Sequence, residues 1–296
     1  MTTTTTTTHD PRRATLTGCG AVALWSLLAL TTVLTAPVPP FLLSALGFAV
    51  GGGLLLAVAA WRGRLGVLRA VPFRSYAFGT LGLFGYHALY FTALRLAPPA
   101  QAGLIAYLWP LLIVLLSGLL PGERLSGRHV AGAVMAFAGA AAIVLARGGG
   151  ADAAPAPLTG YALAASCALV WAVYSLGSRR MAGVPTEAVA VNCLATAALS
   201  AALHPLVEPT LWPVGAAGWL AVLALGLGPV GAAFALWDVG VKRGNIQLLG
   251  TAAYAAPVLS TLALIAAGLA SGGAALILAA VLIAGGALVA ASGGRG

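Results

Sequence analysis

The sequence predicts an all-α membrane protein with ten transmembrane helices, arranged as two inverted five-helix repeats around a central cavity. Three observations support this prediction: the composition, the placement of the basic residues, and an internal repeat. The 296-residue chain is 60% hydrophobic and only 7% charged, whereas a soluble domain carries about 25% charged residues. This composition excludes a soluble enzyme, a disordered protein and a disulfide scaffold.

Ten apolar segments are long enough to cross a bilayer, for which a helix needs about 20 apolar residues. Charged residues, proline and glycine mark the breaks between the segments. The predicted spans are residues 16–34, 41–61, 75–94, 100–119, 129–146, 158–178, 186–204, 217–241, 247–269 and 273–291.

The basic residues predict which side of the membrane each loop occupies. If the N-terminus lies inside, thirteen of the 15 Lys and Arg residues fall in inside segments, and only Arg95 and Arg147 fall outside. Because inside loops are enriched in Lys and Arg, this split favours ten spans with both termini inside. The net charge of +9 is therefore interpreted as a topology signal, and no nucleic acid is expected as a partner.

The two halves of the chain match each other at a nearly constant spacing. Each half holds five predicted spans, and because five is odd, the second half must lie inverted relative to the first. Inverted repeats are typical of transporters, whose halves rock around a central site. The most specific matches are Tyr107 with Tyr254 and Pro110 with Pro257 at a shift of 147 residues, and Trp25 with Trp171 at a shift of 146.

This repeat divides the chain into five parts. They are a disordered cytoplasmic tail (1–15), a first five-helix repeat (16–146), a linker (147–157), a second five-helix repeat (158–291) and a cytoplasmic tail (292–296). The three cysteines show no metal-ligand or CxxC spacing and are expected to pack between helices as small apolar side chains.

One long stretch resembles a known transporter group. YFTALRLAPPAQAGLIAYLWPLLIVLLSGLLPGERLSGRHVAGAVMAFAGAAAIV is similar to the first-repeat core of the EamA branch of the drug/metabolite transporter superfamily, including a proline in the fourth span and a Gly-Glu-Arg loop. Within that branch, GYHALYFTAL and the Tyr- and Trp-rich centre resemble the bacterial aromatic amino-acid exporters of the YddG type. The resemblance covers nearly the whole chain and implies two tandem EamA repeats that export amino acids.

Polar aromatic residues in the third span are candidate binding residues. Tyr86, His87 and Tyr90 share one broad helical face with small residues. His87 is the titratable side chain that lies clearly deep in a span, and such a group usually faces a cavity or a partner. The alternative is a neutral His that is hydrogen-bonded between helices.

Tryptophans placed well inside spans extend this set. Trp25, Trp109 and Trp171 lie where interface anchors would be misplaced, and Tyr174 shares a face with Trp171. They either line a cavity for a small solute or fill the core. The predicted substrate-binding residues are Trp25, Tyr86, His87, Tyr90, Tyr107, Trp109, Trp171, Tyr174 and Tyr254.

Pro110 and Pro257 fall inside the fourth and ninth spans. Each removes a helical hydrogen bond and frees a carbonyl one turn earlier. We expect these helix breaks either to serve binding and gating or to be passive kinks. Gln101, Asn245 and Gln247 near the starts of the same spans are expected to cap helices rather than to contact a ligand.

Few other polar residues are available for chemistry. Asp238 and Lys242 are four residues apart and predict a structural ion pair. Glu123 is expected to pair with Arg124 or Arg128. The remaining acidic and His residues at span ends and in loops are expected to be solvated, namely Glu187, Glu208, His204 and Asp152.

The function predicted from these features is a multi-pass transporter of the bacterial inner membrane that exports aromatic and other neutral amino acids by alternating access. The absence of a deep carboxylate favours facilitated diffusion or weak proton coupling. No P-loop, zinc motif, cofactor or metal site is expected. The expected partners are neutral amino acids and the lipid bilayer; the oligomeric state stays open, and a monomer is compatible with the sequence. The alternatives are a broad drug and metabolite exporter and a non-transporting membrane enzyme or sensor.

Overall fold

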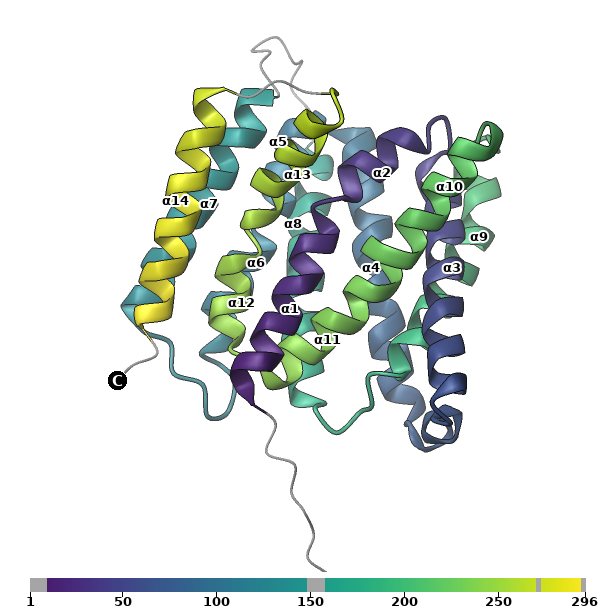
Figure 1. Cartoon of the computed structure of the whole chain (residues 1–296), viewed down its shortest axis with the longest axis horizontal. Helices are drawn as coiled ribbons and strands as arrows, with labels where there is room; N and C mark the ends of the chain where they lie inside the picture. Colours follow the sequence, from purple (N-terminus) through teal and green to yellow (C-terminus); the bar gives the residue numbers. More distant parts are fainter. Residues whose placement is uncertain (1–9, 148–157, 270–272, 294–296) are drawn as a thin grey trace, which may run out of the picture.

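The computed structural model describes residues 10–147, 158–269 and 273–293, which form helices and no β-strand (Figure 1). Seven helical segments in these ranges are long and apolar enough to cross a membrane, and Gln101–Ser117 is apolar but shorter. The prediction of an all-α membrane protein is therefore confirmed. The seven segments are Pro11–Leu34, Pro40–Trp61, Leu158–Arg180, Ala188–Val207, Gly215–Arg243, Ile246–Ala266 and Ala274–Ser292.

The α-helices of the first half overlap the first five predicted spans, and one short 3₁₀ helix lies between the second and third spans. They are α1 (Pro11–Trp25), α2 (Leu28–Leu34), α3 (Pro40–Trp61), the short 3₁₀ helix η1 (Leu65–Ala70), α4 (Phe73–Leu96), α5 (Pro99–Ala106), α6 (Trp109–Ser117) and α7 (Gly127–Arg147).

The helices of the second half overlap the other five. They are α8 (Leu158–Arg180), α9 (Ala188–Val207), α10 (Gly215–Leu225), the π-helix η2 (Gly226–Ala232), α11 (Ala233–Arg243), α12 (Ile246–Ala252), α13 (Ala255–Ala266) and α14 (Ala274–Ser292).

Both prolines that were predicted to break helices follow an interruption. The fourth span is divided at residues 107–108, just before Pro110, and the ninth at 253–254, just before Pro257. The reason is that proline lacks the N–H that would bond to the carbonyl one turn earlier. A third interruption, after Trp25, separates α1 from α2.

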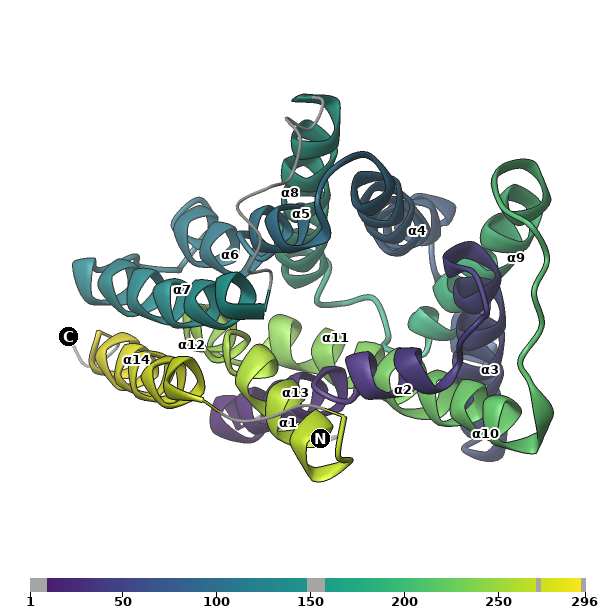
Figure 2. The same ribbon diagram turned by 90° about the horizontal axis from the view of Figure 1, so that it is seen from above.

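Glycines allow the helices to approach closely where they cross. The most extensive contacts join α7 to α14, α3 to α9, α4 to α8, and α1 to α11 (Figure 2). A Cβ atom on Gly51 of α3 would lie 2.7 Å from the backbone nitrogen of Gly231 in η2. Small residues at helix crossings are the usual means of packing in membranes, so glycine is required here for the helices to pack.

The helices form a bundle with two distinct ends. Helix α1 begins and α14 finishes at the end that is lower in Figure 1, which we call the lower end; the other is the upper end. The predicted tail at 1–15 lies largely, and the linker at 147–157 almost entirely, outside the described residues.

Candidate functional site

The centre of the bundle holds a cluster of aromatic rings. Trp25, at the last residue of α1, lies with its ring centroid 5.7 Å from Trp171 in α8 and 6.3 Å from Trp109 at the start of α6. The rings of Phe234 and Trp237 in α11 lie 5.8 and 5.1 Å from Trp25. Three of the predicted tryptophans are thus brought together, and we call these five residues the ring cluster.

Two of these rings lie beside helix interruptions. Trp25 precedes the break between α1 and α2, and Trp109 follows the break between α5 and α6. The indole N–H of Trp237 donates to Ser175 Oγ at 3.1 Å. The indole nitrogen of Trp171, in contrast, is buried and has no hydrogen-bond partner among the described residues. The cluster therefore contains a buried donor that is available to a bound molecule.

The predicted face of α4 extends the ring cluster. Tyr86 lies 5.1 Å from Trp171 and stacks on Tyr90 at 6.0 Å between centroids. The imidazole of His87 packs edge-on against Phe48 of α3 at 4.9 Å, and its Nδ1 lies 2.7 Å from the carbonyl oxygen of Leu83. His87 therefore contacts both the ring cluster's neighbours and its own helix, an arrangement that fits either of the roles left open by the sequence.

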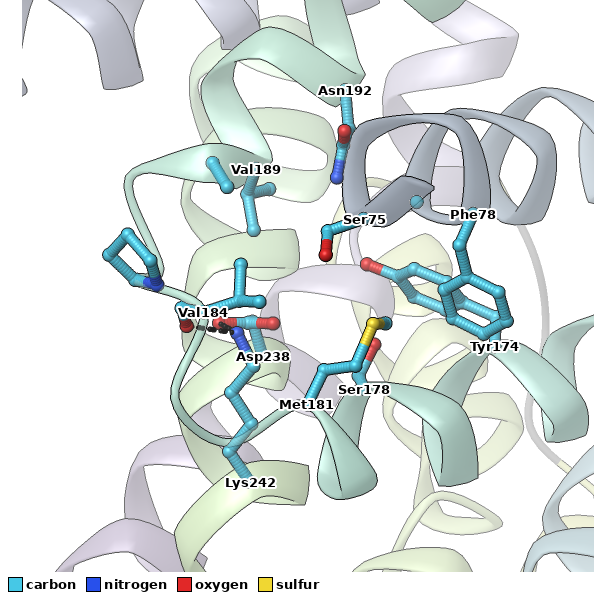
Figure 3. A pocket seen from close by; sticks show the side chains of 13 residues that line it. Ser75, Phe78, Tyr174, Ser178, Met181, Val184, Val189, Asn192, Asp238 and Lys242 are labelled. Carbon is cyan, nitrogen blue, oxygen red and sulfur yellow. Dashed lines mark hydrogen bonds and ion pairs between the residues drawn. The ribbon is translucent and has the colours of Figure 1, made fainter. Parts of the chain in front are cut away.

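Tyr174 connects the ring cluster to a pocket nearer the lower end. Its ring lies 5.2 Å from that of Trp171, and its hydroxyl points into the pocket beside Ser75 (Figure 3). The pocket is lined by Ser75, Phe78, Gly79, Tyr174, Ser178, Met181, Val184, Pro185, Ala188, Val189, Asn192, Asp238 and Lys242.

The predicted ion pair forms one wall of this pocket. Lys242 Nζ lies 2.8 Å from Asp238 Oδ2, and both side chains are at most 5% exposed. Lys242 also donates to the carbonyl of Val184 at 2.8 Å, and the hydroxyl of Thr186 donates to Asp238 at 2.7 Å. This satisfied network fixes the connection between α8 and α9 against α11.

Tyr107 and Tyr254 belong to a second group of buried residues. Tyr254 is fully buried against α7 and α14, its ring is 5.9 Å from Phe137, and its hydroxyl accepts the backbone N–H of Leu111 at 3.0 Å. Tyr107 packs beside the same cluster of buried residues. The hydroxyl of Tyr254 therefore satisfies a donor at the break beside Pro110, and its proposed contact with substrate stays a prediction.

A polar network closes the lower end. Glu123, in the loop between α6 and α7, pairs with Arg179 in the last turn of α8 and accepts from Gln247 of α12 at 3.0 Å. Arg179 also donates to the carbonyls of Val241 and Gly244 at 2.9 and 2.8 Å. The expectation that Glu123 pairs with Arg124 or Arg128 was therefore wrong, because the fold brings Arg179 of α8 to Glu123 instead.

A second network lies at the upper end. Glu208 Oε2 pairs with Arg95 at 2.7 Å, while Oε1 accepts the backbone N–H of Leu42 at 2.8 Å and lies 2.9 Å from His204 Nδ1. The Glu208 side chain is 1% exposed. The expectation that Glu208 and His204 are solvated was wrong, because α3 and α4 both cover the end of α9.

The smaller polar predictions have mixed outcomes. Asn245 caps α12 by accepting the N–H of Leu248 at 2.8 Å, whereas Gln101 bonds to the hydroxyl of Tyr161. Glu187 is partly exposed and pairs with Arg64 at 2.9 Å. Partial burial raises the pKa of Glu187, but the hydrogen bond from Arg64, a backbone hydrogen bond and the charges of Arg64 and Arg62 together outweigh burial, so the pKa lies below its usual value. Asp152 lies outside the described residues.

Metal-ligating groups do not gather in the described part of the chain. No cluster of three or more His, Cys, Asp or Glu side chains is found there. Cys19, Cys167 and Cys193 are all free thiols. The chemistry available at the centre is therefore aromatic packing and hydrogen bonding.

Comparisons with known proteins agree with this geometry. Residues 12–145 match the EamA-like transporter family. The chain is similar to an aromatic amino acid exporter YddG of Ancylobacter novellus, with 59% identity over 89% of this chain and 91% of the relative. It is also similar to the aromatic amino acid exporter YddG of Salmonella typhimurium, with 28% identity over 84% and 87% of the two chains. A crystal structure that is 56% identical superposes with a TM-score of 0.91 over 97% of this chain and 100% of that one.

Proposed function

Because this chain belongs to the EamA-like transporter family, we propose that it exports aromatic and other neutral amino acids across the bacterial inner membrane by alternating access. The chain is a multi-pass membrane transporter and not an enzyme. The substrate class is that of its relatives, which are aromatic amino acid exporters. The observation in this chain that supports the proposal is the ring cluster.

The ring cluster has the composition expected of a site for an aromatic side chain. Four indoles and the phenyl ring of Phe234 meet at centroid distances of 5.1 to 6.3 Å. Aromatic rings prefer edge-to-face and offset contacts at about 4.5–7 Å, so a substrate ring could replace one of these mutual contacts at little cost. Smaller apolar side chains would bind to the same surface by burial alone.

The head group of an amino acid needs polar partners in the same place. The unpartnered N–H of Trp171 and the phenol of Tyr86 beside it supply hydrogen bonds without a fixed charge. Burying a net charge in an apolar site costs several kcal/mol. A zwitterion therefore suits this site better than an anion or a cation does.

The packing of the helices supports the proposed ten-helix inverted repeat. With a shift of 146–147 residues, α4 corresponds to α11 and α8 to α1, and the contact α4–α8 corresponds to the contact α11–α1. The contacts α7–α14 and α3–α9 each join two helices that correspond to each other. A two-fold axis between the halves would produce this set of contacts. Thr15 near the start of α1 accepts the backbone N–H of Asn245 at the lower end, where Arg179 lies in the last turn of α8. The equivalent helices α1 and α8 therefore run in opposite directions.

The two polar networks suit gates on either side of the ring cluster. The Glu123–Arg179 network joins α6, α8 and α12 at the lower end, and the Arg95–Glu208 network joins α4, α9 and α3 at the upper end. Alternating access needs such contacts to break one at a time. Pro110 and Pro257 follow the interruptions in the two spans whose lower ends reach the Glu123 network, and they are the proposed bending points.

The charge distribution supports a lower end that faces the cytoplasm. The described lower-end residues include Arg62, Arg64, Arg74, Arg179 and Lys242, whereas Arg95 lies at the upper end. Under the inside enrichment of Lys and Arg, both chain termini are cytoplasmic. The transport mode proposed is facilitated diffusion or weak coupling to protons.

Counterflow in proteoliposomes tests this proposal. Vesicles loaded with unlabelled phenylalanine should accumulate external labelled phenylalanine, and tryptophan and leucine should compete. Trp109→Ala and Trp171→Ala should each reduce the initial rate at least tenfold, whereas Trp219→Ala should not, because Trp219 is exposed and stacks on Trp212. Full activity in both cluster variants would overturn the site. Uptake of sugars or organic cations that amino acids do not compete with would instead indicate the broad exporter.

A further inference from the structure

A row of polar side chains runs the length of α9, separate from the ring cluster. The residues recur every four positions and begin in the pocket with Asn192, which is one of its lining residues. The row ends at the Glu208 network of the upper end. We call this row the α9 seam; its members are Asn192, Thr196, Ser200, His204 and Glu208.

The first three members of the seam each have a buried side-chain oxygen without a partner. Asn192, Thr196 and Ser200 are 6%, 0% and 1% exposed, and Asn192 Oδ1, Thr196 Oγ1 and Ser200 Oγ have no hydrogen-bond partner among the described residues. Buried hydroxyls elsewhere behave differently: that of Thr251 bonds to the carbonyl of Gln247 at 3.0 Å. Because an unsatisfied buried polar group costs about 1–3 kcal/mol, three in one row indicate an additional hydrogen-bonding species.

The spacing of the seam suits water. Four helical residues rise about 6 Å, and two hydrogen bonds of about 2.8 Å through one water span nearly the same distance. One water molecule between successive side chains would therefore satisfy each oxygen. A single bound cation would not, since oxygens separated by about 6 Å cannot share one coordination sphere.

Helix α4 faces the seam in a constant register. Asn192 packs directly on Gly79, and Glu208 pairs with Arg95; both pairs are separated by 113 residues. Helices with the same rise that keep the same offset place Ser200 at the level of His87. The seam thus passes at the level of an imidazole in the middle of the bundle.

We propose that the α9 seam holds a file of water molecules through which protons cross the bundle in step with amino-acid export. This inference rests on the proposed function and names its coupling ion. A proton taken up by His204 or Glu208 passes from water to hydroxyl to water, each oxygen accepting one proton and releasing another. A proton then leaves the file through the pocket nearer the lower end. For each proton taken from the solution at the upper end, one proton is thus delivered to the solution at the lower end.

The ionisable groups around the seam fit this route. At the upper end Glu208 faces Arg95 and His204, and at the pocket Asp238 faces Lys242, with the phenol of Tyr174 nearby. His87 of α4 lies at the level of Ser200 and packs against Phe48 and Phe234, and α3 carries no titratable side chain between Pro40 and Trp61. Each carboxylate is paired with a basic side chain, Glu208 with Arg95 and Asp238 with Lys242. Each end of the file therefore has a group that can bind a proton, and neither pair carries a net charge.

The test separates exchange from proton movement in the same proteoliposomes. Counterflow at equal pH reports amino-acid exchange, and a trapped pH dye under a clamped membrane potential reports protons that move when a phenylalanine gradient is applied. The wild type should give a pH change that reverses with the gradient. Thr196→Val should reduce that change at least fivefold while counterflow stays within twofold. Thr251→Val is the matched control and should alter neither.

Ser200→Ala with Ser117→Ala as its control repeats the test if Thr196→Val does not fold, because the Ser117 hydroxyl already bonds to the carbonyl of Val114. Wild-type counterflow without any pH change would overturn the proton file. So would a full pH change in both seam variants. Absence of counterflow with every amino acid would instead overturn the proposed function, and the coupling with it.

Discussion

Trp25 and Trp171 occupy equivalent positions in the two halves of the chain, and their rings lie 5.7 Å apart. A residue can contact its own repeat mate only near the axis that relates the repeats. Under the proposed inverted repeat, the ring cluster therefore lies where the halves meet, which is where such transporters bind their substrates.

The free indole N–H of Trp171 should bind substrate directly. Trp171→Phe keeps an aromatic ring but removes the donor, so the KM for phenylalanine in counterflow should rise about tenfold, the equivalent of one hydrogen bond of about 1.4 kcal/mol. Trp237→Phe is the matched control, because its N–H is already used by Ser175. An unchanged KM in Trp171→Phe would remove this contact from the mechanism.

The Glu123–Arg179 pair should hold the lower end closed. In a protein whose native cysteines are replaced by alanine, Glu123→Gln should make Ser178→Cys in the pocket react several-fold faster with a polar maleimide. The exchange of the two charges, Glu123→Arg with Arg179→Glu, should restore slow labelling. Arg64→Gln, which breaks the more exposed lower-end pair with Glu187, should have no effect; equal acceleration there would show general loosening rather than a gate.

Tyr254 should stabilise the helix break rather than bind substrate. Tyr254→Phe leaves the buried N–H of Leu111 without its acceptor, at a cost of about 1–3 kcal/mol, so the melting temperature should fall by several degrees while the KM is unchanged. The control is Tyr76→Phe, whose hydroxyl bonds to Leu68 nearer the surface, where water can replace it. A raised KM at an unchanged melting temperature would instead assign Tyr254 to the binding site.

Glycine packing between α3 and η2 should be essential to folding. Gly51→Ala forces a methyl group against the backbone of Gly231, and overpacking of this kind costs about 1–3 kcal/mol. Gly53→Ala, two residues further along, meets nothing within 4 Å and should be neutral or slightly stabilising. Thermal unfolding in detergent measures both, and equal effects would contradict the described approach of these helices.

Much of the helix pattern could be predicted because apolar length and helix-breaking residues are local properties. The breaks before Pro110 and Pro257 follow from the chemistry of proline alone. The pairing of Asp238 with Lys242 follows from helical spacing. None of these depends on how the helices pack against one another.

The parts of the site that were missed depend on that packing. Arg179 reaches Glu123 from a different helix, and Glu208 is buried because two other helices cover it. The positions of Phe234 and Trp237, in contrast, follow from the internal repeat. A shift of 147 converts His87 into Phe234 and Tyr90 into Trp237, so the sequence did contain the signal that would have found them.

The interruption that follows Trp25 has no counterpart in the other half. Helix α8 is continuous through the equivalent residues 172–173, and α4 is regular through residues 79–85, where its equivalent contains the π-helix η2. Two segments with matching sequence patterns have thus taken different shapes in one molecule. If the halves trade shapes during each transport cycle, this single conformation already contains a template of the opposite one, with α1 straightened, α8 bent just beyond Trp171 and the π-helical turn transferred to α4.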